Sequence, residues 1–313
     1  MKSMKFSKIN KIIQDARRGK MFVLVDDEGR ENEGDLIIPA SKVSAKSISF
    51  MAKHGRGLIC LALTQTQVNK LNLPLMSPVN KSRTQTAFTI SIEAKKGITT
   101  GISAHDRART IKTAIKKNAS PKSIISPGHV FPLVSKNGGV LIRAGHTEAS
   151  VDVSRLSKCG SSAVICEIMN DDGSMARRPE LEVFAKTHGI KMGTIADLIH
   201  YRIVNEQTVD HIETSQVSTV HGKLALHVFR DRIQGAHHLA LVKGQPTPEQ
   251  ATTVRVHLAD TLRDVMGLMK GEQCRWDANR AIHEIAQAQA GVFVLIDDGR
   301  PTQDLKDQLD IFL

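Results

Sequence analysis

The sequence has little of three features that would mark common classes of protein. Its four cysteines form no Cys-x-x-Cys pair, which argues against a secreted disulfide framework and for a reduced, cytoplasmic protein. Aromatic residues make up only 4% of the chain, so stacking on nucleic-acid bases is not expected as its main activity. No apolar run reaches the length of a membrane span, and the basic start lacks the apolar core of a signal peptide.

Charge, by contrast, is abundant and unevenly distributed. Residues 1–200 hold 31 Lys and Arg against 17 Asp and Glu, a net charge of +14, whereas residues 201–313 hold 12 against 15, a net charge of −3. The basic first part suits an anionic partner, either nucleic acid or a phosphorylated metabolite, although a solvated basic surface explains it equally well. The change of sign predicts two domains, residues 1–207 and 208–313.

Short apolar runs alternate with helical patterns along the first domain. The start predicts an amphipathic helix with Ile9, Ile12 and Ile13 on one face and Gly19 at its end. A hairpin turn is expected at "KNGG", between "HVFPLVS" and "GVLIRAG". Together these patterns predict a layered α/β domain with a mixed sheet. After residue 207, antiparallel β segments and one helix predict a small β-rich α+β domain.

The stretch "DDEGRENEGD", residues 26–35, places six acidic residues between two apolar, strand-like runs. If the backbone stays extended, Glu31, Glu33 and Asp35 fall on one face, because strand side chains alternate with period two. Three carboxylates on one face favour a hard divalent cation such as magnesium. Arg30 beside them could bind a phosphate or stabilise an oxyanion. An exposed acidic loop is an equal alternative for this stretch alone.

Three further stretches carry residues suited to chemistry. "RAGHTEA" holds Arg143, His146, Thr147 and Glu148, a set in which the imidazole can complete a metal site with a carboxylate and the arginine and threonine can hold a phosphate. "SPGHVFPL" offers His129 directly after a Pro-Gly turn. "SAVICE" ends in Glu167, and an acidic side chain in so apolar a strand is costly unless it is paired or functional.

Taken together, these stretches closely resemble the 3,4-dihydroxy-2-butanone 4-phosphate synthase family of riboflavin biosynthesis, over about residues 5–204. The resemblance implies an α/β fold of three layers with a mixed, twisted sheet, and a homodimer. It also implies a lyase that converts D-ribulose 5-phosphate to 3,4-dihydroxy-2-butanone 4-phosphate and formate with magnesium or manganese. The matching stretches are "DDEGRENEGDLIIPA", "HGRGLICLAL", "TAFTISIEA", "TTGISAHDRARTI", "PGHVFPL", "GVLIRAGHTEASVDVSRL", "CEIMNDDGSMARRPEL" and "HGIKMGTIADLIHYR".

The resemblance also assigns roles to residues. It places the metal on Glu31 and His146 and the essential histidine and glutamate on His129 and Glu167. The implied substrate-binding residues are Arg30, Glu31, Asp35, Arg143, Ala144, Gly145, His146, Thr147 and Glu167. Weaker candidates in matching stretches are Asp26, Glu33, Cys60, Thr100 and Asp106.

The second domain resembles the start of GTP cyclohydrolase II, a family that holds zinc with three cysteines. Asp260 stands where the first of these cysteines is expected, and only Cys274 lies nearby. The histidines of this domain show no recognisable ligand spacing, and one thiolate cannot make a zinc site. The chain also ends at Leu313, before the family's remaining segments. We therefore expect a zinc-free domain that does not open the guanine ring of GTP.

A different class of function is a non-catalytic protein that binds nucleotide or RNA through its basic surface. That reading requires lost catalytic residues or a basic face bearing aromatics, and the sequence has neither. We therefore expect a cytoplasmic enzyme whose partner is a small sugar phosphate, with neither nucleic acid nor membrane as a partner.

Overall fold

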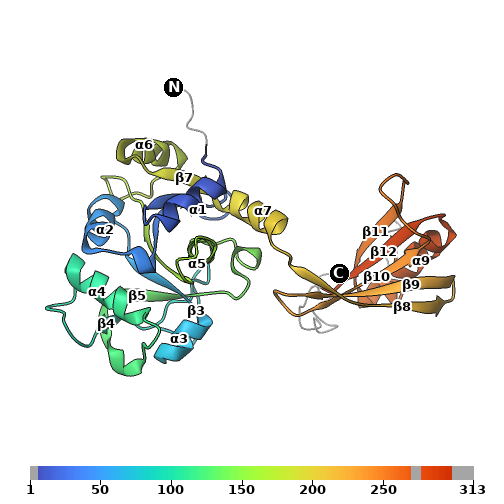
Figure 1. Cartoon of the computed structure of the whole chain (residues 1–313), viewed down its shortest axis with the longest axis horizontal. Coiled ribbons are helices and arrows are strands. Elements are labelled where there is room, and N and C mark those ends of the chain that lie inside the picture. Colours follow the sequence, from blue (N-terminus) through green and yellow to red (C-terminus); the bar gives the residue numbers. More distant parts are fainter. Residues whose placement is uncertain (1–5, 269–275, 298–313) are drawn as a thin grey trace. The chain divides into compact units, whose positions relative to one another are not determined.

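The first unit of the chain, Met1–Asn205, is built on a seven-stranded sheet in the order β4-β5-β3-β6-β2-β1-β7 (Figure 1). This computed structural model describes residues 6–268 and 276–297. The strands are β1 (Phe22–Val25), β2 (Gly34–Pro39), β3 (Cys60–Thr64), β4 (Ile92–Ala94), β5 (Ile124–Ser135), β6 (Ser162–Glu167) and β7 (Lys191–Thr194). The α-helices are α1 (Ile9–Arg17), α2 (Ala45–Phe50), α3 (Gln65–Leu71), α4 (Ala104–Ala114), α5 (His146–Leu156), α6 (Arg178–His188) and α7 (Ile195–Asn205).

Helices cover both faces of this sheet, and each face has its own apolar core. Side chains of α1, α5 and α7 pack on one face, and those of α2, α3, α4 and α6 pack on the other. The sheet is mixed, because β1 pairs in parallel with β7 and β3 with β5, whereas the other neighbours are antiparallel. The predicted α/β architecture of three layers with a mixed sheet is therefore confirmed.

The N-terminal helix follows directly from its sequence pattern. Ile9, Ile12 and Ile13 are buried on the face of α1 that contacts the sheet and α5. Gly19 has a φ of +76°, a conformation that glycine adopts without steric cost, and the chain turns there into β1. The predicted amphipathic helix and its end are both confirmed.

The hairpin predicted at "KNGG" is wrong, because residues 139–141 form a turn of 3₁₀-helix that leads into α5. Gly138 and Gly139 have φ values of +89° and +64°. The Asp152 carboxylate on α5 accepts the backbone N–H of Val140 at 2.9 Å, and a Cβ on Gly139 would lie 2.3 Å from it. A buried carboxylate thus takes the hydrogen bond that a returning strand would have needed.

The second unit, Glu206–Leu313, has a five-stranded sheet in the order β11-β12-β10-β9-β8. Phe293 of this sheet packs against Ala281 and Ile285 of helix α9. The predicted β-rich α+β character of this part is confirmed. None of the helices in residues 6–268 and 276–297 has the length and apolar character that crossing a membrane requires. The elements are β8 (Val209–Thr219), β9 (Gly222–Asp231), β10 (His237–Lys243), β11 (Thr253–Leu258), α8 (Thr261–Asp264), α9 (Ala278–Gln287) and β12 (Gly291–Ile296).

Candidate active site

The acidic loop between β1 and β2 folds around one buried carboxylate. Asp26 accepts the backbone N–H of Glu33 at 2.8 Å and that of Glu31 at 3.1 Å. The Arg30 guanidinium lies between two acids, 2.8 Å from Asp26 and 2.6 Å from Glu31. Asp26 therefore organises the loop backbone, and Arg30 supplies the positive charge that keeps these carboxylates together.

The backbone of this stretch does not stay extended, so the condition for Glu31, Glu33 and Asp35 to share one strand face is not met. Residues 28–31 form a turn, Asn32 has a left-handed φ of +55°, and β2 begins only at Gly34. Arg177, just before α6, donates to the backbone carbonyl of Asn32 at 2.7 Å and to that of Glu31, and it lies 3.6 Å from the Glu33 carboxylate. Glu33 therefore faces Arg177, and a turn rather than strand alternation brings Glu31 toward Asp35.

His146 begins α5 and faces the carboxylates of this loop. Its Nδ1 lies 3.9 Å from a carboxylate oxygen of Glu31 and 3.9 Å from one of Asp35. Its Nε2 is buried without a hydrogen-bond partner. Burial lowers the pKa of His146 by more than the carboxylates of Asp26 and Glu31 raise it, so the ring is held neutral, the form that binds metals.

The donor set around His146 fits a divalent cation. Donor atoms of Asp26, Glu31 and His146 all lie within 4.8 Å of one another, the one such group of three in residues 6–268 and 276–297. A separation of 3.9 Å is too long for a hydrogen bond, whereas ligands bound to one magnesium ion at about 2.1 Å lie about 3–4 Å apart. Carboxylate oxygens and a neutral imidazole are suitable ligands for magnesium or manganese.

Asp35 and Glu167 lie side by side at the ends of adjacent strands, β2 and β6. Burial, and then the nearby carboxylates of Glu167 and Glu31, raise the pKa of Asp35 well above its ordinary value. Glu167 accepts the backbone N–H of Leu58 at 2.8 Å, and a Cβ on Gly57 would come within 2.6 Å of it. The glycine in "GRGL" thus lets the backbone approach Glu167 and fix it beside Asp35.

Two free, buried cysteines lie near these carboxylates: Cys60 and Cys166. Burial, and then the charges of Glu167 and Asp35, raise the pKa of Cys60 well above its ordinary value, and the same causes raise that of Cys166. Both thiols are therefore protonated at neutral pH. Since the thiolate is the reactive form, Cys60 is a poor candidate for a nucleophile.

The predicted substrate segment, residues 143–147, runs into the first turn of α5. Arg143 is already engaged: it donates to Glu148 at 2.6 Å, to the Thr84 carbonyl at 2.9 Å and to the Thr86 hydroxyl at 3.2 Å. The backbone N–H groups at a helix start have no partners within the helix, and they favour anions. The segment thus offers anion-binding groups next to His146.

His129 lies apart from the metal-binding group in the single chain. The Pro-Gly turn predicted before it is wrong, because residues 127–129 all belong to β5. His129 Nδ1 makes a hydrogen bond with the Glu93 carboxylate of β4. The pairing of β3 with β5 and with β6 puts one strand between His129 and Glu167. At about 4.8 Å per strand, their backbones are roughly 10 Å apart. The two predicted catalytic residues therefore share one end of the sheet without touching.

Two further weaker candidates lie at the start of α4: Thr100 in the loop that leads into the helix, and Asp106 in its first turn. Asp106 accepts the Thr99 hydroxyl at 2.7 Å and the backbone N–H of Gly101 at 3.1 Å. The Thr99 hydroxyl is the main reason that the pKa of Asp106 is lowered. Thr100 is exposed in this loop. Asp106 thus holds the backbone of the loop.

Sequence reasoning missed two residues that touch predicted site groups, Glu93 and Arg177, and it named Glu148 without predicting its pairing with Arg143. Glu93 ends the apolar run "FTISIE", the same kind of signal that identified Glu167, and it was a sign available from the sequence. Arg177 lies among other charged residues beside a helix, where sequence alone gives no sign of its partners.

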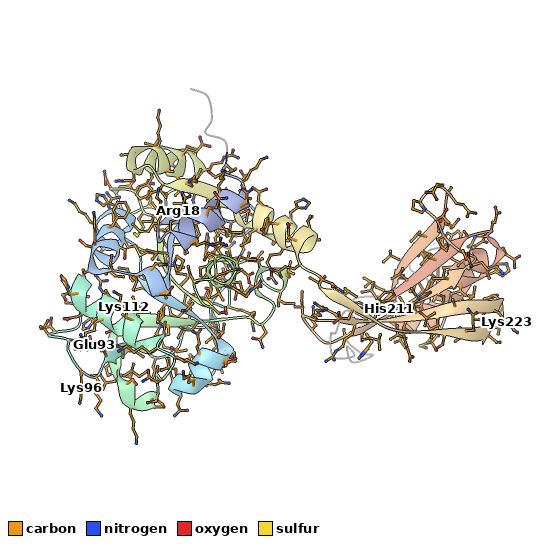
Figure 2. All side chains as sticks on the ribbon, viewed as in Figure 1. Arg18, Glu93, Lys96, Lys112, His211 and Lys223 are labelled. Atoms are coloured by element: carbon orange, nitrogen blue, oxygen red, sulfur yellow. The ribbon has the colours of Figure 1, made fainter. Side chains whose placement is uncertain are left out.

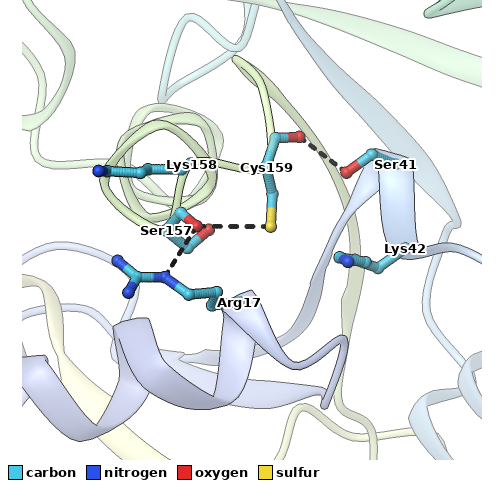
Figure 3. A pocket seen from close by; sticks show the side chains of 6 residues that line it. All are labelled: Arg17, Ser41, Lys42, Ser157, Lys158 and Cys159. Carbon is cyan, nitrogen blue, oxygen red and sulfur yellow. Dashed lines mark hydrogen bonds between the residues drawn. The ribbon is translucent and has the colours of Figure 1, made fainter.

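A cavity of ≈ 390 Å³ lies elsewhere in the first unit, between the ends of α1 and α5 (Figure 3). Arg17 donates to the Ser157 carbonyl at 3.3 Å, and the Ser41 hydroxyl donates to the Cys159 carbonyl at 2.7 Å. Cations at helix C-termini commonly satisfy the final carbonyls in this way. No predicted site residue lines this cavity.

The polar cluster of the second unit is hydrogen-bonded within itself. His257 Nε2 and the Asp264 carboxylate lie 2.8 Å apart. Asp260, expected at a zinc-ligand position, instead accepts the backbone N–H of Arg263 at 3.1 Å and forms an ion pair with that side chain at 3.0 Å. Cys274 lies outside the described residues, so the absence of zinc stays a prediction.

Comparison with known proteins agrees with this geometry. Residues 10–201 match the family described as 3,4-dihydroxy-2-butanone 4-phosphate synthase, and residues 210–312 match GTP cyclohydrolase II. A 3,4-dihydroxy-2-butanone 4-phosphate synthase of Pseudomonas aeruginosa is 51% identical over 293 residues, covering 94% of this chain and 80% of the relative.

Solved structures show the same likeness. A two-domain 3,4-dihydroxy-2-butanone 4-phosphate synthase from A. baumannii superposes with a TM-score of 0.81 at 47% identity, covering 97% of this chain and 85% of that one. A 3,4-dihydroxy-2-butanone 4-phosphate synthase in complex with two magnesium ions has a TM-score of 0.62 at 41% identity, covering 64% of this chain and 99% of that one. The chain therefore belongs to the 3,4-dihydroxy-2-butanone 4-phosphate synthase family.

Proposed function

We propose that the protein is a divalent-metal-dependent lyase that converts D-ribulose 5-phosphate to 3,4-dihydroxy-2-butanone 4-phosphate and formate. The carrying observation is the cluster of Glu31, Asp35, His146 and Glu167, which joins one buried and two partly buried carboxylates to a neutral imidazole at the end of the sheet. Family membership supports the same assignment.

Glu31 and His146 are the residues that would hold magnesium or manganese, with Asp26 within reach. A bound divalent cation polarises the substrate carbonyl and so makes the neighbouring C–H more acidic. Arg30 lies beside Glu31 and is placed to balance negative charge on the substrate oxygens.

Proton transfers fall to the side chains at the end of the sheet. Glu167, fixed by the Leu58 amide, is our candidate for the base that takes the proton next to the carbonyl, and the protonated form of Asp35 can donate beside it. His129 is the second candidate for moving protons. The five-carbon phosphate divides into a four-carbon phosphate and formate with no oxidant, reductant or net water.

The phosphate of the substrate would bind at the start of α5. Residues 143–147 combine a guanidinium, a hydroxyl and the free N–H groups of the first helical turn. Arg143 is held there by Glu148 and the loop carbonyl of Thr84, which presets the position of its guanidinium for the phosphate.

A direct assay tests the proposal. Purified protein is incubated with ribulose 5-phosphate and magnesium, formate is measured by a coupled dehydrogenase, and the four-carbon phosphate is identified by NMR. We expect stoichiometric formate and product that cease in excess chelator and return with magnesium. Absence of formate with either metal, or full turnover in chelator, would contradict the proposal.

We propose further that the enzyme is a homodimer. Large apolar side chains of the loop that touches Arg143 are exposed in the single chain: Leu75 by 50%, Met76 by 51% and Val79 by 62%. Contact with a second copy would cover them. Light scattering coupled to size exclusion should give twice the 34.3 kDa mass of the chain, and a monomer at assay concentration would refute this.

The second domain, proposed as residues 208–313, is assigned no GTP cyclohydrolase II activity. Asp260 is used as a helix cap rather than left free as a ligand. Elemental analysis of the full chain should find no stoichiometric zinc, and incubation with GTP should release no formate. One zinc per chain together with GTP-dependent formate would make the protein bifunctional.

A further inference from the structure

Glu93 is placed against His129 by an irregularity in the sheet. Strand β4 pairs with β5, but its register shifts between Ile92 and Glu93, whose partners are Val130 and Ile125. Residues 126–129 of β5 therefore have no pairing partner on β4 and form a bulge. Bulges of this kind redirect side chains. Figure 2 labels Glu93 on this edge strand of the first unit. The result is the hydrogen bond between the Glu93 carboxylate and His129 Nδ1.

The two partners differ in exposure. The Glu93 side chain is 12% exposed, whereas that of His129 is 44% exposed. Among the described residues, the imidazole is the one hydrogen-bond partner of this carboxylate. A carboxylate removed from water depends on such a partner. Because Nδ1 faces Glu93, Nε2 is the ring nitrogen left for a substrate.

Glycine positions make this contact possible. A Cβ on Gly101, whose φ is +92°, would lie 1.5 Å from the Glu93 carboxylate and 2.7 Å from His129 Nδ1. A Cβ on Gly128 would lie 2.4 Å from Glu93 Cγ. Asp106 in turn holds the backbone N–H of Gly101. The loop before α4 and the Pro127–Gly128 segment of β5 thus enclose the carboxylate from two sides.

We infer that Glu93 is a positioning residue for His129 in the proposed reaction, on which this inference rests. Its carboxylate accepts the Nδ1 proton and so keeps a lone pair on Nε2. When Nε2 takes a proton, the electron pair of the broken bond stays on the substrate, and the new positive charge on the ring lies beside the Glu93 carboxylate. An imidazole oriented by a carboxylate is a recurrent arrangement in proton transfer.

The test combines turnover with the tautomer of His129 in the full-length protein. Glu93→Gln preserves shape but removes charge, and Glu93→Ala removes both. The signals of His129 in nitrogen NMR are identified by their disappearance in the His129→Gln variant. They should show the proton on Nδ1 in the wild type and a shift of that proton toward Nε2 in Glu93→Ala. Turnover of Glu93→Gln should fall about 10²-fold with KM nearly unchanged. Asp264→Asn, which alters the histidine–carboxylate pair of the other unit, is the matched control and should change neither readout.

Two results would overturn the inference. One is a wild-type His129 with its proton on Nε2. The other is wild-type turnover in both Glu93 variants. Glu93→Gln keeps the side-chain volume, so it remains informative if Glu93→Ala fails to fold. The NMR measurement needs no substrate, and a failure of the proposed reaction is therefore distinguishable from a failure of the Glu93 assignment.

Discussion

Each unit of this protein buries a histidine beside carboxylates, yet the two clusters differ in how completely their bonds are made. In the first unit, His146 lies 3.9 Å from Glu31 and from Asp35, and its Nε2 has no partner. In the second unit, His257 hydrogen-bonds Asp264 at 2.8 Å. Asp264 also accepts the backbone N–H groups of Asp260 and Ala278 at 2.9 and 3.0 Å, joining β11, α8 and the start of α9.

This difference distinguishes a binding site from a cluster that only stabilises the fold. Buried polar groups in folded proteins are nearly always satisfied, so a buried cluster with unused donors and acceptors indicates a missing ligand. A cluster whose groups all bond to one another contributes to stability instead. Residue types alone do not make this distinction, because both clusters contain histidine and acidic residues.

The largest loss of turnover is expected when Glu167 is substituted. Glu167→Gln keeps an oxygen that can accept the Leu58 amide but removes the base, so turnover should fall by about 10³-fold or more while the fold is retained. The measurement is formate release, with circular dichroism as the check on folding. Near wild-type turnover would place the proton transfer elsewhere and weaken the contrast between the two clusters.

Loss of a metal ligand comes next. Glu31→Gln should weaken manganese binding by at least about tenfold, since even changes in the groups that orient metal ligands commonly cost 10- to 100-fold in affinity. Calorimetry with manganese, without substrate, measures it. Glu28→Gln is the matched control, because Glu28 is exposed in the same loop. Equal affinities for both variants would mean that the acidic loop is only a charged surface.

A substitution of Arg177 tests whether the conformation of the acidic loop affects metal and substrate binding. Its bonds to the carbonyls of Glu31 and Asn32 hold the turn that aims Glu31 at His146. Arg177→Met should raise KM and weaken manganese binding by about tenfold, because a hydrogen bond from a charged group contributes about 1.5–3 kcal/mol. The neighbouring Arg178→Met is the control, since Arg178 pairs with Glu182 on the surface of α6. Identical behaviour of the two variants would contradict this role.

Sequence patterns predicted those parts of the fold that depend on local periodicity. The apolar face of α1 and the alternating strands of the second unit follow from side chains a few residues apart. Patterns failed where a distant group decides the conformation. Arg177 lies 145 residues from Asn32, and it helps to fold a stretch that alternation alone predicts as extended. The Asp152 carboxylate likewise accepts the backbone N–H of Val140, which the expected hairpin would have paired with a neighbouring strand.

The candidate site was predicted residue by residue from family resemblance, but its geometry was not. The sequence gives no sign that Arg143 is held by Glu148, or that one strand separates His129 from Glu167. Glu93 was overlooked although it interrupts an apolar run in the same way as Glu167. An acidic residue at the end of a buried strand is therefore a signal worth following at every occurrence.

The smallest effect on turnover, and the clearest on stability, is expected at Asp264. Burial raises the pKa of this carboxyl, but the hydrogen bond from His257 and those from the backbone of Asp260 and Ala278 outweigh it, and the net shift is downward. A carboxyl with a lowered pKa in the folded state stabilises the protein above its unfolded pKa, near 3.9, and that stabilisation is lost as the pH falls through the folded value.

Asp264→Asn should therefore destabilise the second unit by about 1–2 kcal/mol at pH 7, the usual cost of weakening a partly buried charged hydrogen bond, without changing formate release. The difference from wild type should shrink as the pH is lowered below about 4, because the wild-type carboxyl then also becomes neutral. Trp276 is the single tryptophan of the chain and belongs to this unit, so its fluorescence during urea unfolding reports on it specifically. Loss of turnover in Asp264→Asn would contradict a purely structural role for the second cluster. A stability difference that does not change with pH would contradict the stabilising role of the Asp264 charge.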